Sequence, residues 1–594
     1  MKLPSLSSTL TLFLLGGAAA FAQLGADGPV RNPSISDDGR FIAFDTGAVN
    51  LIAGSGANQA NVGFFDRQTR RIFNAQFAGQ NTYWGGALFP QMSNDGEWMV
   101  FQSSNSFIPN RTTTDIYVCA VRSQTVGLAP PSKFKRISRN AAFVAGNGVS
   151  NYPTISADGR FVAYMSVATN LTADTVPAGV SQIYRHDRDA DEDGIFDESE
   201  PDATATVLVS QVGGTPGNAD SRWPTISADG SRILFVTNAN NLPADLFSST
   251  RIWIGGAVTG TSGSRRGLSP DGAITLSRTR VYPAGNTVSS GDYYRYETWM
   301  PSPPRAIGFP DFGYGNIAST GATKILSSTT HDVPPIDNTN TRHVYLFDRL
   351  AQRTTLVSTG PQGPGNDDSG QVDDNDAYLD LSRDGRYAAF VTRADNFGFE
   401  DTNNTLDIIF KDLLTGELDR IEVDVTPPTW PDPGLAVSQV TDQSATLSWN
   451  PASDRAGIEY YRIEFDETLT RSVRGGSGYA ATGLRPSTPY TAEVIAIDYS
   501  GNEISGGTVG FTTAADRGAN PGFSVTGFSF SRSQIDLSFR SQPGKTYAVD
   551  ASENLADWTE LAAGIGSSGG GFTSASVPMP AETGAAFHIR VREE

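Results

Sequence analysis

The chain has 594 residues, with 44 lysines and arginines against 64 aspartates and glutamates, so its formal charge is −20. Charged residues make up only 18% of it, while 62 glycines and 34 prolines punctuate it. This composition is typical of turn-dense all-β proteins and excludes coiled coils and charge-rich disordered chains. The length predicts two to four domains. The negative charge argues against nucleic acid as a partner, because phosphates would be repelled.

Residues 1–22 are predicted to be a signal peptide. Lys2 supplies the positive start, Leu10 to Ala20 the apolar segment, and Ala20-Phe21-Ala22 the cleavage site before Gln23. A buried N-terminal helix is the alternative. The apolar run is too short to span a bilayer, and no later run reaches that length. We therefore expect an exported protein (periplasmic, cell-surface or extracellular) with no membrane span. Cys119, the only cysteine, is expected to be buried and structural.

A repeated phrase dominates the first 400 residues. Pro-x-Ile-Ser-x-Asp-Gly, or a close variant, ends at Gly39, Gly96, Gly159 and Gly230. Shorter forms end at Gly272 and Gly385, and a degenerate one ends at Gly321. Glycine accepts the positive φ of a tight turn, so Asp-Gly between apolar runs predicts a hairpin. Each turn leads into an apolar, β-rich run, such as residues 40–44 or 160–164.

Each unit of the repeat predicts four antiparallel strands. A third strand with an acidic end follows in several units, as at 62–66, 182–187, 343–348 and 407–412, and a fourth closes the unit, as at 206–210. About seven such units predict an all-β fold, a β-propeller over residues 23–425. A β-solenoid and tandem sandwiches are the alternatives, and six or eight blades remain open.

The repeat also resembles a known family. Its Ser-x-Asp-Gly-Arg core is followed by Ala-x-Asn-Leu at 48–51, 168–171 and 239–242. This combination resembles the TolB-type propeller repeat of exported bacterial proteins, over about residues 30–425. The resemblance implies a propeller used mostly for binding and scaffolding.

One loop in the third unit matches a calcium-binding template. Counting Asp189 as position 1, carboxylates stand at positions 1, 3, 5, 9 and 12, Gly194 is at the turning position 6, and the residue at position 7 can offer its carbonyl. The predicted ligands are Asp189, Asp191, Asp193, Ile195, Asp197 and Glu200. The flanks are strand-like, so this is an isolated loop with a structural calcium. A solvated acidic turn is the alternative.

Two further β modules follow a proline-rich linker at 425–433. Residues 426–515 contain Trp449, the Leu-x-Pro-x-Thr-x-Tyr segment ending at Tyr490, and an Asp-Tyr-Ser-Gly-Asn segment at 498–502. They resemble a fibronectin type III domain, which implies a spacer or adhesion module with Trp449 and Tyr490 in the core. The Tyr490 hydroxyl can cap the backbone at the sandwich edge. Residues 518–594 predict a second small β-sandwich, in which Trp558 is expected to pack in the core rather than bind a glycan.

No catalytic motif stands out. Only four histidines are present, without zinc spacing, and no nucleophile elbow or phosphate loop occurs in the right context. We expect an exported, calcium-stabilised propeller that binds a protein or glycan partner as a monomer and is not an enzyme. The alternative is a glycoside hydrolase or polysaccharide lyase whose carboxylates meet across the central funnel, since sequence spacing does not reveal such pairs.

Overall fold

The structure of the protein is a computed structural model. It describes residues 26–594 apart from 53–59, 75–85, 105–112, 123–133, 201, 244–249, 261–263, 273–274, 281–293, 301, 308–316, 321–322, 330–340, 371–377, 400, 402–404, 466–468, 516–524, 531–533, 553–557, 569–570 and 579–587. The predicted signal peptide therefore lies outside the described residues. Within them the named elements are all β-strands, and no helix has the length and apolar character needed to cross a bilayer.

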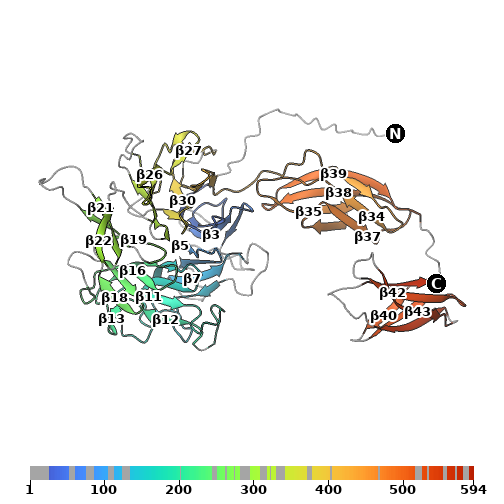
Figure 1. Ribbon diagram of the computed structural model, residues 1–594, viewed down its shortest axis with the longest axis horizontal. Coiled ribbons are helices and arrows are strands. Elements are labelled where there is room, and N and C mark those ends of the chain that lie inside the picture. The colour runs from blue at the N-terminus through green and yellow to red at the C-terminus, as the bar shows by residue number, and fades with distance from the viewer. Residues whose placement is uncertain are drawn as a thin grey trace, which may run out of the picture. The chain divides into compact units, whose positions relative to one another are not determined.

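The described part of residues 30–420 forms seven four-stranded antiparallel sheets, called blades 1 to 7 here (Figure 1). Blades 1 to 3 contain β1 (Val30–Ile35), β2 (Phe41–Thr46), β3 (Asn61–Asp66), β4 (Arg71–Asn74), β5 (Ala87–Met92), β6 (Trp98–Ser103), β7 (Asp115–Ala120), β8 (Phe134–Arg136), β9 (Ser150–Ile155), β10 (Phe161–Ser166), β11 (Gln182–Asp187) and β12 (Ala205–Leu208). Blades 4 and 5 contain β15 (Ser221–Ile226), β16 (Arg232–Thr237), β17 (Thr250–Ile254), β18 (Ala257–Gly260), β19 (Ser264–Leu268), β20 (Thr275–Arg280), β21 (Tyr294–Met300) and β22 (Ser302–Ile307). Blades 6 and 7 contain β23 (Ile317–Ala318), β24 (Lys324–Thr329), β25 (His343–Asp348), β26 (Arg353–Leu356), β29 (Leu379–Leu381), β30 (Tyr387–Thr392), β31 (Asp407–Asp412) and β32 (Leu418–Arg420).

Every blade uses four consecutive strands in their chain order. Short hairpins precede blades 4 and 7, formed by β13 (Gln211–Val212) with β14 (Thr215–Pro216) and by β27 (Thr359–Gly360) with β28 (Gly363–Pro364). The first strands of successive blades contact one another, and β1 also contacts β29. These strands therefore surround a common axis, and the predicted all-β propeller is confirmed.

Strand alternation explains why the blades stack. Successive side chains of a strand point to opposite faces of its sheet, so a strand between two blades can be apolar on both faces. In β2, Phe41 and Ala43 pack with blade 2 in one apolar cluster, while Ile42 and Phe44 pack with blade 7 in another. Equivalent clusters join blades 2 and 3, 3 and 4, and 6 and 7.

The ring closes between blades 1 and 7 without a shared strand, because each of these blades is built from its own consecutive strands. The Val30 amide donates to the Leu406 carbonyl at 2.9 Å. The Arg67 guanidinium lies 3.5 Å from the ring centre of Phe410, and its Nε is 3.2 Å from Asp419. Side-chain contacts and isolated backbone hydrogen bonds therefore hold blades 1 and 7 together.

The Ser-x-Asp-Gly phrase is a hydrogen-bonded turn between the first and second strands of a blade. In blade 1, the Ser36 hydroxyl donates to Asp38 at 2.6 Å and accepts from the Phe41 amide at 3.0 Å. Gly39 has a φ of +68°, which explains why glycine is needed there. The same serine–aspartate bond occurs in blades 2, 3, 4, 5 and 7.

The acidic end of the third strand also has a structural partner. Arg40, directly after the turn glycine, binds both carboxylate oxygens of Asp66 at 2.9 and 2.7 Å. Arg160 binds Asp187 in the same way in blade 3. Such two-point arginine–carboxylate pairs fix geometry as well as charge, so this pair sets the register of the second and third strands.

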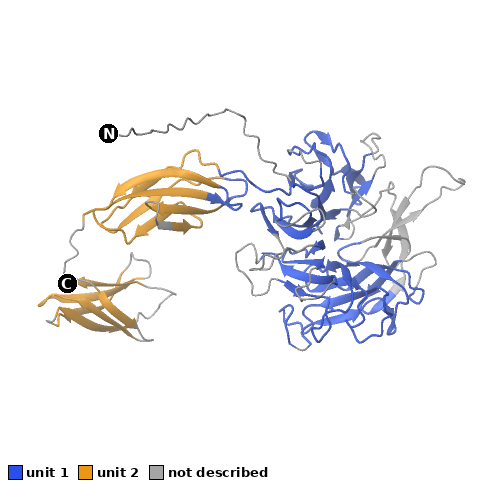
Figure 2. Ribbon diagram, turned by 180° about the vertical axis from the view of Figure 1, so that it is seen from behind, with its two compact units in different colours: residues 1–428, 454–458, 497–502 blue, residues 429–453, 459–496, 503–594 orange. Residues whose placement is uncertain are grey.

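The C-terminal part consists of sandwiches. Contacts divide the chain into unit 1 (residues 1–428, 454–458 and 497–502) and unit 2 (residues 429–453, 459–496 and 503–594) (Figure 2). The first sandwich contains β33 (Ala436–Ser438), β34 (Ser444–Ser448), β35 (Ile458–Phe465), β36 (Leu469–Val473), β37 (Gly478–Thr482), β38 (Pro489–Asp498) and β39 (Glu503–Thr512). The second contains β40 (Val525–Phe530), β41 (Gln534–Arg540), β42 (Thr546–Ser552), β43 (Thr559–Gly566), β44 (Phe572–Pro578) and β45 (His588–Glu593).

Of the aromatic residues expected in the sandwich cores, Trp449 is buried, whereas Tyr490 and Trp558 are only half-buried. The Tyr490 hydroxyl accepts a hydrogen bond from the Arg485 amide at 2.8 Å, which confirms the tyrosine corner. The Arg590 guanidinium lies 4.3 Å from the ring centre of Trp558. Cys119 is buried, as expected.

The turn glycines pack against the preceding blade, which gives a stability prediction. A Cβ on Gly159 would lie 2.3 Å from the Trp98 ring, while one on Gly179 would meet no atom within 4 Å, although both residues have a positive φ. Gly179→Ala should cost about 1 kcal/mol from backbone strain alone. Gly159→Ala should cost about 3 kcal/mol, because the clash adds to the strain. Chemical denaturation of both variants checks this, and equal losses would contradict the packing described here.

Candidate functional site

The acidic loop after β11 gathers three carboxylates. Asp189, Asp191 and Asp193 each offer an oxygen, and these oxygens lie within 4.8 Å of one another. Asp189 is buried, whereas the other two are exposed. Gly194 has a φ of +88°, so the chain turns where the calcium template requires it. Hard cations such as calcium are bound by oxygen ligands of this kind, and the three carboxylates fit one.

Asp197 lies apart from this group and forms a buried ion pair. Its Oδ2 accepts hydrogen bonds from Arg188 Nε at 3.0 Å and Arg188 Nη2 at 2.6 Å. The Arg188 side chain is fully buried, donates to the Gly159 carbonyl at 2.7 Å and lies 4.0 Å from the Trp98 ring centre. Asp197 therefore anchors the acidic loop to the boundary between blades 2 and 3.

The other predicted ligands are at the loop surface. The Ile195 side chain is exposed, and its amide donates to Asp193 at 2.8 Å. Glu200 is exposed and accepts from the Ser199 amide at 3.0 Å. Among the described residues of the loop, the structure thus brings Asp189, Asp191 and Asp193 together and leaves Asp197 and Glu200 outside that group. Sequence spacing did not anticipate the role of Arg188.

A second group of three carboxylates lies in unit 1. Asp424, Asp454 and Asp498 also offer oxygens within 4.8 Å of one another. Asp498 is fully buried and accepts hydrogen bonds from the Ser500 and Asn502 amides at 2.8 and 2.9 Å. These bonds assign Asp498 a role in holding its own loop.

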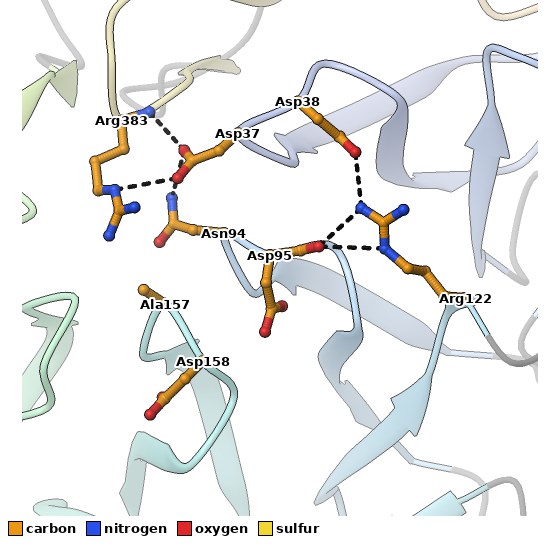
Figure 3. A pocket seen from close by; sticks show the side chains of 8 residues that line it. All are labelled: Asp37, Asp38, Asn94, Asp95, Arg122, Ala157, Asp158 and Arg383. Carbon is orange, nitrogen blue, oxygen red and sulfur yellow. Dashed lines mark hydrogen bonds and ion pairs between the residues drawn. The ribbon is translucent and has the colours of Figure 1, made fainter.

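A cavity of about 420 Å³ opens at the Asp-Gly turns (Figure 3). We call it the mouth pocket. Its lining comes from four blades: Asp37, Asp38, Asn94, Asp95, Arg122, Ala157, Asp158 and Arg383. Backbone bonds join the turns of successive blades, as from the Asp37 amide to the Asn94 carbonyl at 2.8 Å and from the Asp95 amide to the Ala157 carbonyl at 3.2 Å. The pocket wall is therefore rigid.

Both arginines of the mouth pocket are paired with its aspartates. Arg383 Nε lies 3.1 Å from Asp37, which also accepts from the Asn94 amide group at 3.0 Å. Arg122 Nη2 lies 2.7 Å from Asp38 (Figure 3). Partial burial opposes ionisation of Asp38, but hydrogen bonds from Ser36, Arg40 and Arg122 hold its pKa below the usual range. The pocket is thus a fixed polar surface with an excess of negative charge.

The first strands of the blades surround the axis, and we call them the inner strands. Four residues on them have an unusual backbone conformation. Asn32, Phe89, Tyr152 and Trp223 occupy the same position in blades 1 to 4, each directly before a proline, and their φ values are +50°, +53°, +52° and +54°. The strand register shifts at each of them, as between Arg31 and Ser34. A β-bulge of this kind re-aims a side chain. Left-handed backbone costs about 1–3 kcal/mol at a residue other than glycine.

Side chains of the preceding blade bind the backbone of two of these bulges. The Phe89 amide donates to Asp45 at 3.0 Å, and the Tyr152 amide donates to Gln102 at 2.9 Å. Asp45 also accepts from the Asn32 amide group at 2.6 Å. Because Asp45 is buried, its pKa rises to about 6. Burial likewise raises the pKa of Asp380 to about 6, although it accepts from the Ile35 amide at 2.8 Å.

Sheets and site together define a β-propeller protein with C-terminal sandwiches. The fibronectin type III domain model matches residues 426–508, which confirms that assignment. Chitinase Chi52 of Paenibacillus xylanexedens is 35% identical over 99 residues, which are 17% of this chain and 18% of that protein. The chain spans less than a fifth of the length of the curated relatives it matches.

Solved structures similar to this chain include other β-propellers. The propeller domain of the trilobed protease from Pyrococcus furiosus is 10% identical with a TM-score of 0.28, and the match covers 82% of this chain and 97% of that one. The putative TolB from Agrobacterium tumefaciens is 12% identical with a TM-score of 0.22, over 64% and 87% of the two chains. The propeller assignment rests on the sheets and contacts of this chain.

The buried Asp45 gives a prediction about pH. Its folded pKa of about 6 exceeds the unfolded value of 3.8, so the native state holds the proton more tightly. The protonated carboxyl therefore contributes fully to the free energy of unfolding below pH 3.8. This contribution falls by about 3 kcal/mol as the pH rises through 6. Asp45→Asn should remove this part of the pH dependence. Urea unfolding of both proteins at pH 4 and 7 measures it, and identical pH dependences would contradict the assignment.

Proposed function

We propose that this chain is an exported, calcium-stabilised propeller that binds a protein or glycan partner at the mouth pocket and serves as a non-catalytic scaffold. The observation that carries the proposal is the pocket itself, a rigid cavity of about 420 Å³ built by turns of four blades. Concave sites with a few convergent polar groups are the usual places where proteins bind ligands. The C-terminal sandwiches then act as spacer and attachment.

The chemistry of the pocket favours binding over catalysis. The aspartates of its Asp-Gly turns accept hydrogen bonds from serines of the same turns, and its arginines are paired with aspartates. Such groups hold their own loops and present a fixed pattern of donors and acceptors. A catalytic acid needs a pKa near the working pH, and hydrogen bonds lower that of Asp38 instead.

A glycan-cleaving enzyme is the second candidate. The observation in its favour is that burial raises the pKa values of Asp45 and Asp380 to about 6. Asp380 lies on the inner strand β29, and Asp45 lies on β2, next to the inner strand β1. A carboxyl with such a pKa can act as a general acid. Release of reducing or unsaturated ends from polysaccharides, lost in Asp380→Asn, would favour this candidate over a binding protein.

The acidic loop supports the calcium part of the proposal. Asp189, Asp191 and Asp193 would hold the ion, with the Ile195 carbonyl and Glu200 available from the same loop. Three carboxylates within 4.8 Å repel one another, and a divalent cation would relieve that repulsion. The ion would then fix the loop that Asp197 and Arg188 anchor to blades 2 and 3.

If the loop binds calcium, variants of the calcium ligands and a variant of the Asp197–Arg188 ion pair should differ in how calcium changes their melting temperatures. Chelation should lower the melting temperature, and Asp191→Asn with Asp193→Asn should remove that response with little change in the chelated protein, because both residues are exposed. Asp197→Asn should cost about 3–5 kcal/mol with or without calcium, because it leaves buried Arg188 unpaired. Calorimetry with calcium and with chelator checks this. Melting curves that do not respond to calcium would contradict the site.

Binding at the mouth pocket can be tested with a matched pair of variants. Ala157→Arg places a long cation in the pocket without changing Ser156 or Asp158. Ala228 occupies the same turn position in blade 4 and does not line the pocket, so Ala228→Arg is the control. Partners found on a glycan array or an exported-protein panel should bind Ala157→Arg at least tenfold more weakly and Ala228→Arg normally. Equal binding by both variants would contradict the assignment of the pocket.

A further inference from the structure

Three aromatic residues lie on strands that lead toward the Asp-Gly turns of the propeller. Phe89, Tyr152 and Trp223 are half-buried, and they lie on β5, β9 and β15, whose ends lead into the turns of blades 2, 3 and 4. The ring centres of Phe89 and Tyr152 are 4.8 Å apart with an angle of 49°. The rings of these two successive blades therefore contact each other. We call the three residues the aromatic row.

The backbone conformation at these positions does not favour aromatic residues. A φ near +50° is tolerated best by glycine and asparagine, and blade 1 has Asn32 at the equivalent place. Bulky residues in this conformation are outliers that occur mostly where function requires them. Since three blades carry a bulky ring against this preference, the rings themselves are the feature to explain.

Core packing does not account for the rings fully. Several large aromatic residues of the second and third strands, such as Phe44, Phe64 and Phe101, are completely buried between blades. The residues of the aromatic row keep part of their surface exposed, although they stand on the strands nearest the axis.

We propose that the aromatic row binds a neutral saccharide chain. Sugar rings have apolar faces that stack on aromatic side chains and hydroxyls that hydrogen-bond to polar neighbours. The turns that follow the strands of Phe89 and Tyr152 carry such polar groups in Asn94, Asp95 and Asp158. The arginines of the mouth pocket are already paired with aspartates, and the chain carries a charge of −20. An anionic glycan would be repelled, so the uncharged class fits.

This inference rests on the proposed function, because it names the class of ligand that the propeller would bind. A protein partner would contact the exposed turns and would not need rings on the inner strands. The two ligand classes therefore respond differently to changes in the aromatic row, and a test can separate them.

The test uses the full chain and titration calorimetry with cellohexaose, chitohexaose and xylohexaose, and with hexagalacturonate as the charged counterpart. Tyr152→Gly and Trp223→Gly remove the rings and relieve the positive φ, so both variants should fold, which melting curves verify. A neutral hexasaccharide should bind, and each variant should weaken it at least tenfold. Binding should also change the tryptophan fluorescence of the parent protein and not that of Trp223→Gly.

Trp558→Ala is the matched control, because Trp558 is a half-buried tryptophan of the C-terminal sandwich. It should bind like the parent protein. The inference is overturned if no neutral hexasaccharide binds, if hexagalacturonate binds instead, or if Trp558→Ala alone abolishes binding. Capture of a protein partner that Ala157→Arg weakens and the glycine variants leave unchanged would also overturn it, while the proposed binding function would stand.

Discussion

The structure depends on burial of apolar faces between neighbouring blades around a closed ring. In blade 1 the second strand is apolar on both sides, as Phe41 and Ala43 face one blade and Ile42 and Phe44 face the other. Burial of this kind is the main favourable term in folding. It requires every blade to have two neighbours, so blade 1 must meet blade 7, the last blade along the chain.

The turns that make the ring regular also make the binding surface. In Ser-x-Asp-Gly the serine, aspartate and glycine form the turn, so only the x position is free to vary. It is Asp37 in blade 1, Asn94 in blade 2, Ala157 in blade 3 and Arg383 in blade 7, and all four line the mouth pocket. The repeated turn therefore has a constant backbone structure and presents a different side chain in each blade. Such a surface suits recognition of a ligand rather than a single chemical reaction.

Local features were predictable from the sequence, and features that depend on distant contacts were not. The Asp-Gly turns and the tyrosine corner at Tyr490 follow from short patterns, because their hydrogen bonds lie within a few residues. Asp197 was assigned to calcium by spacing, yet buried Arg188 holds it, since burial of an arginine does not show in the loop template. The aromatic row was missed because a residue before proline is expected to have a negative φ, whereas Phe89, Tyr152 and Trp223 have positive φ values.

Closure of the ring is the central claim, and hydrogen exchange of the Val30 amide tests it most directly. This amide donates to the Leu406 carbonyl of blade 7. We expect it to exchange about as slowly as the amides of the inner strand β9, because opening it requires disrupting the whole ring. Rapid exchange of β1 and β31 while blades 2 to 4 stay protected would show an open ring and contradict the account.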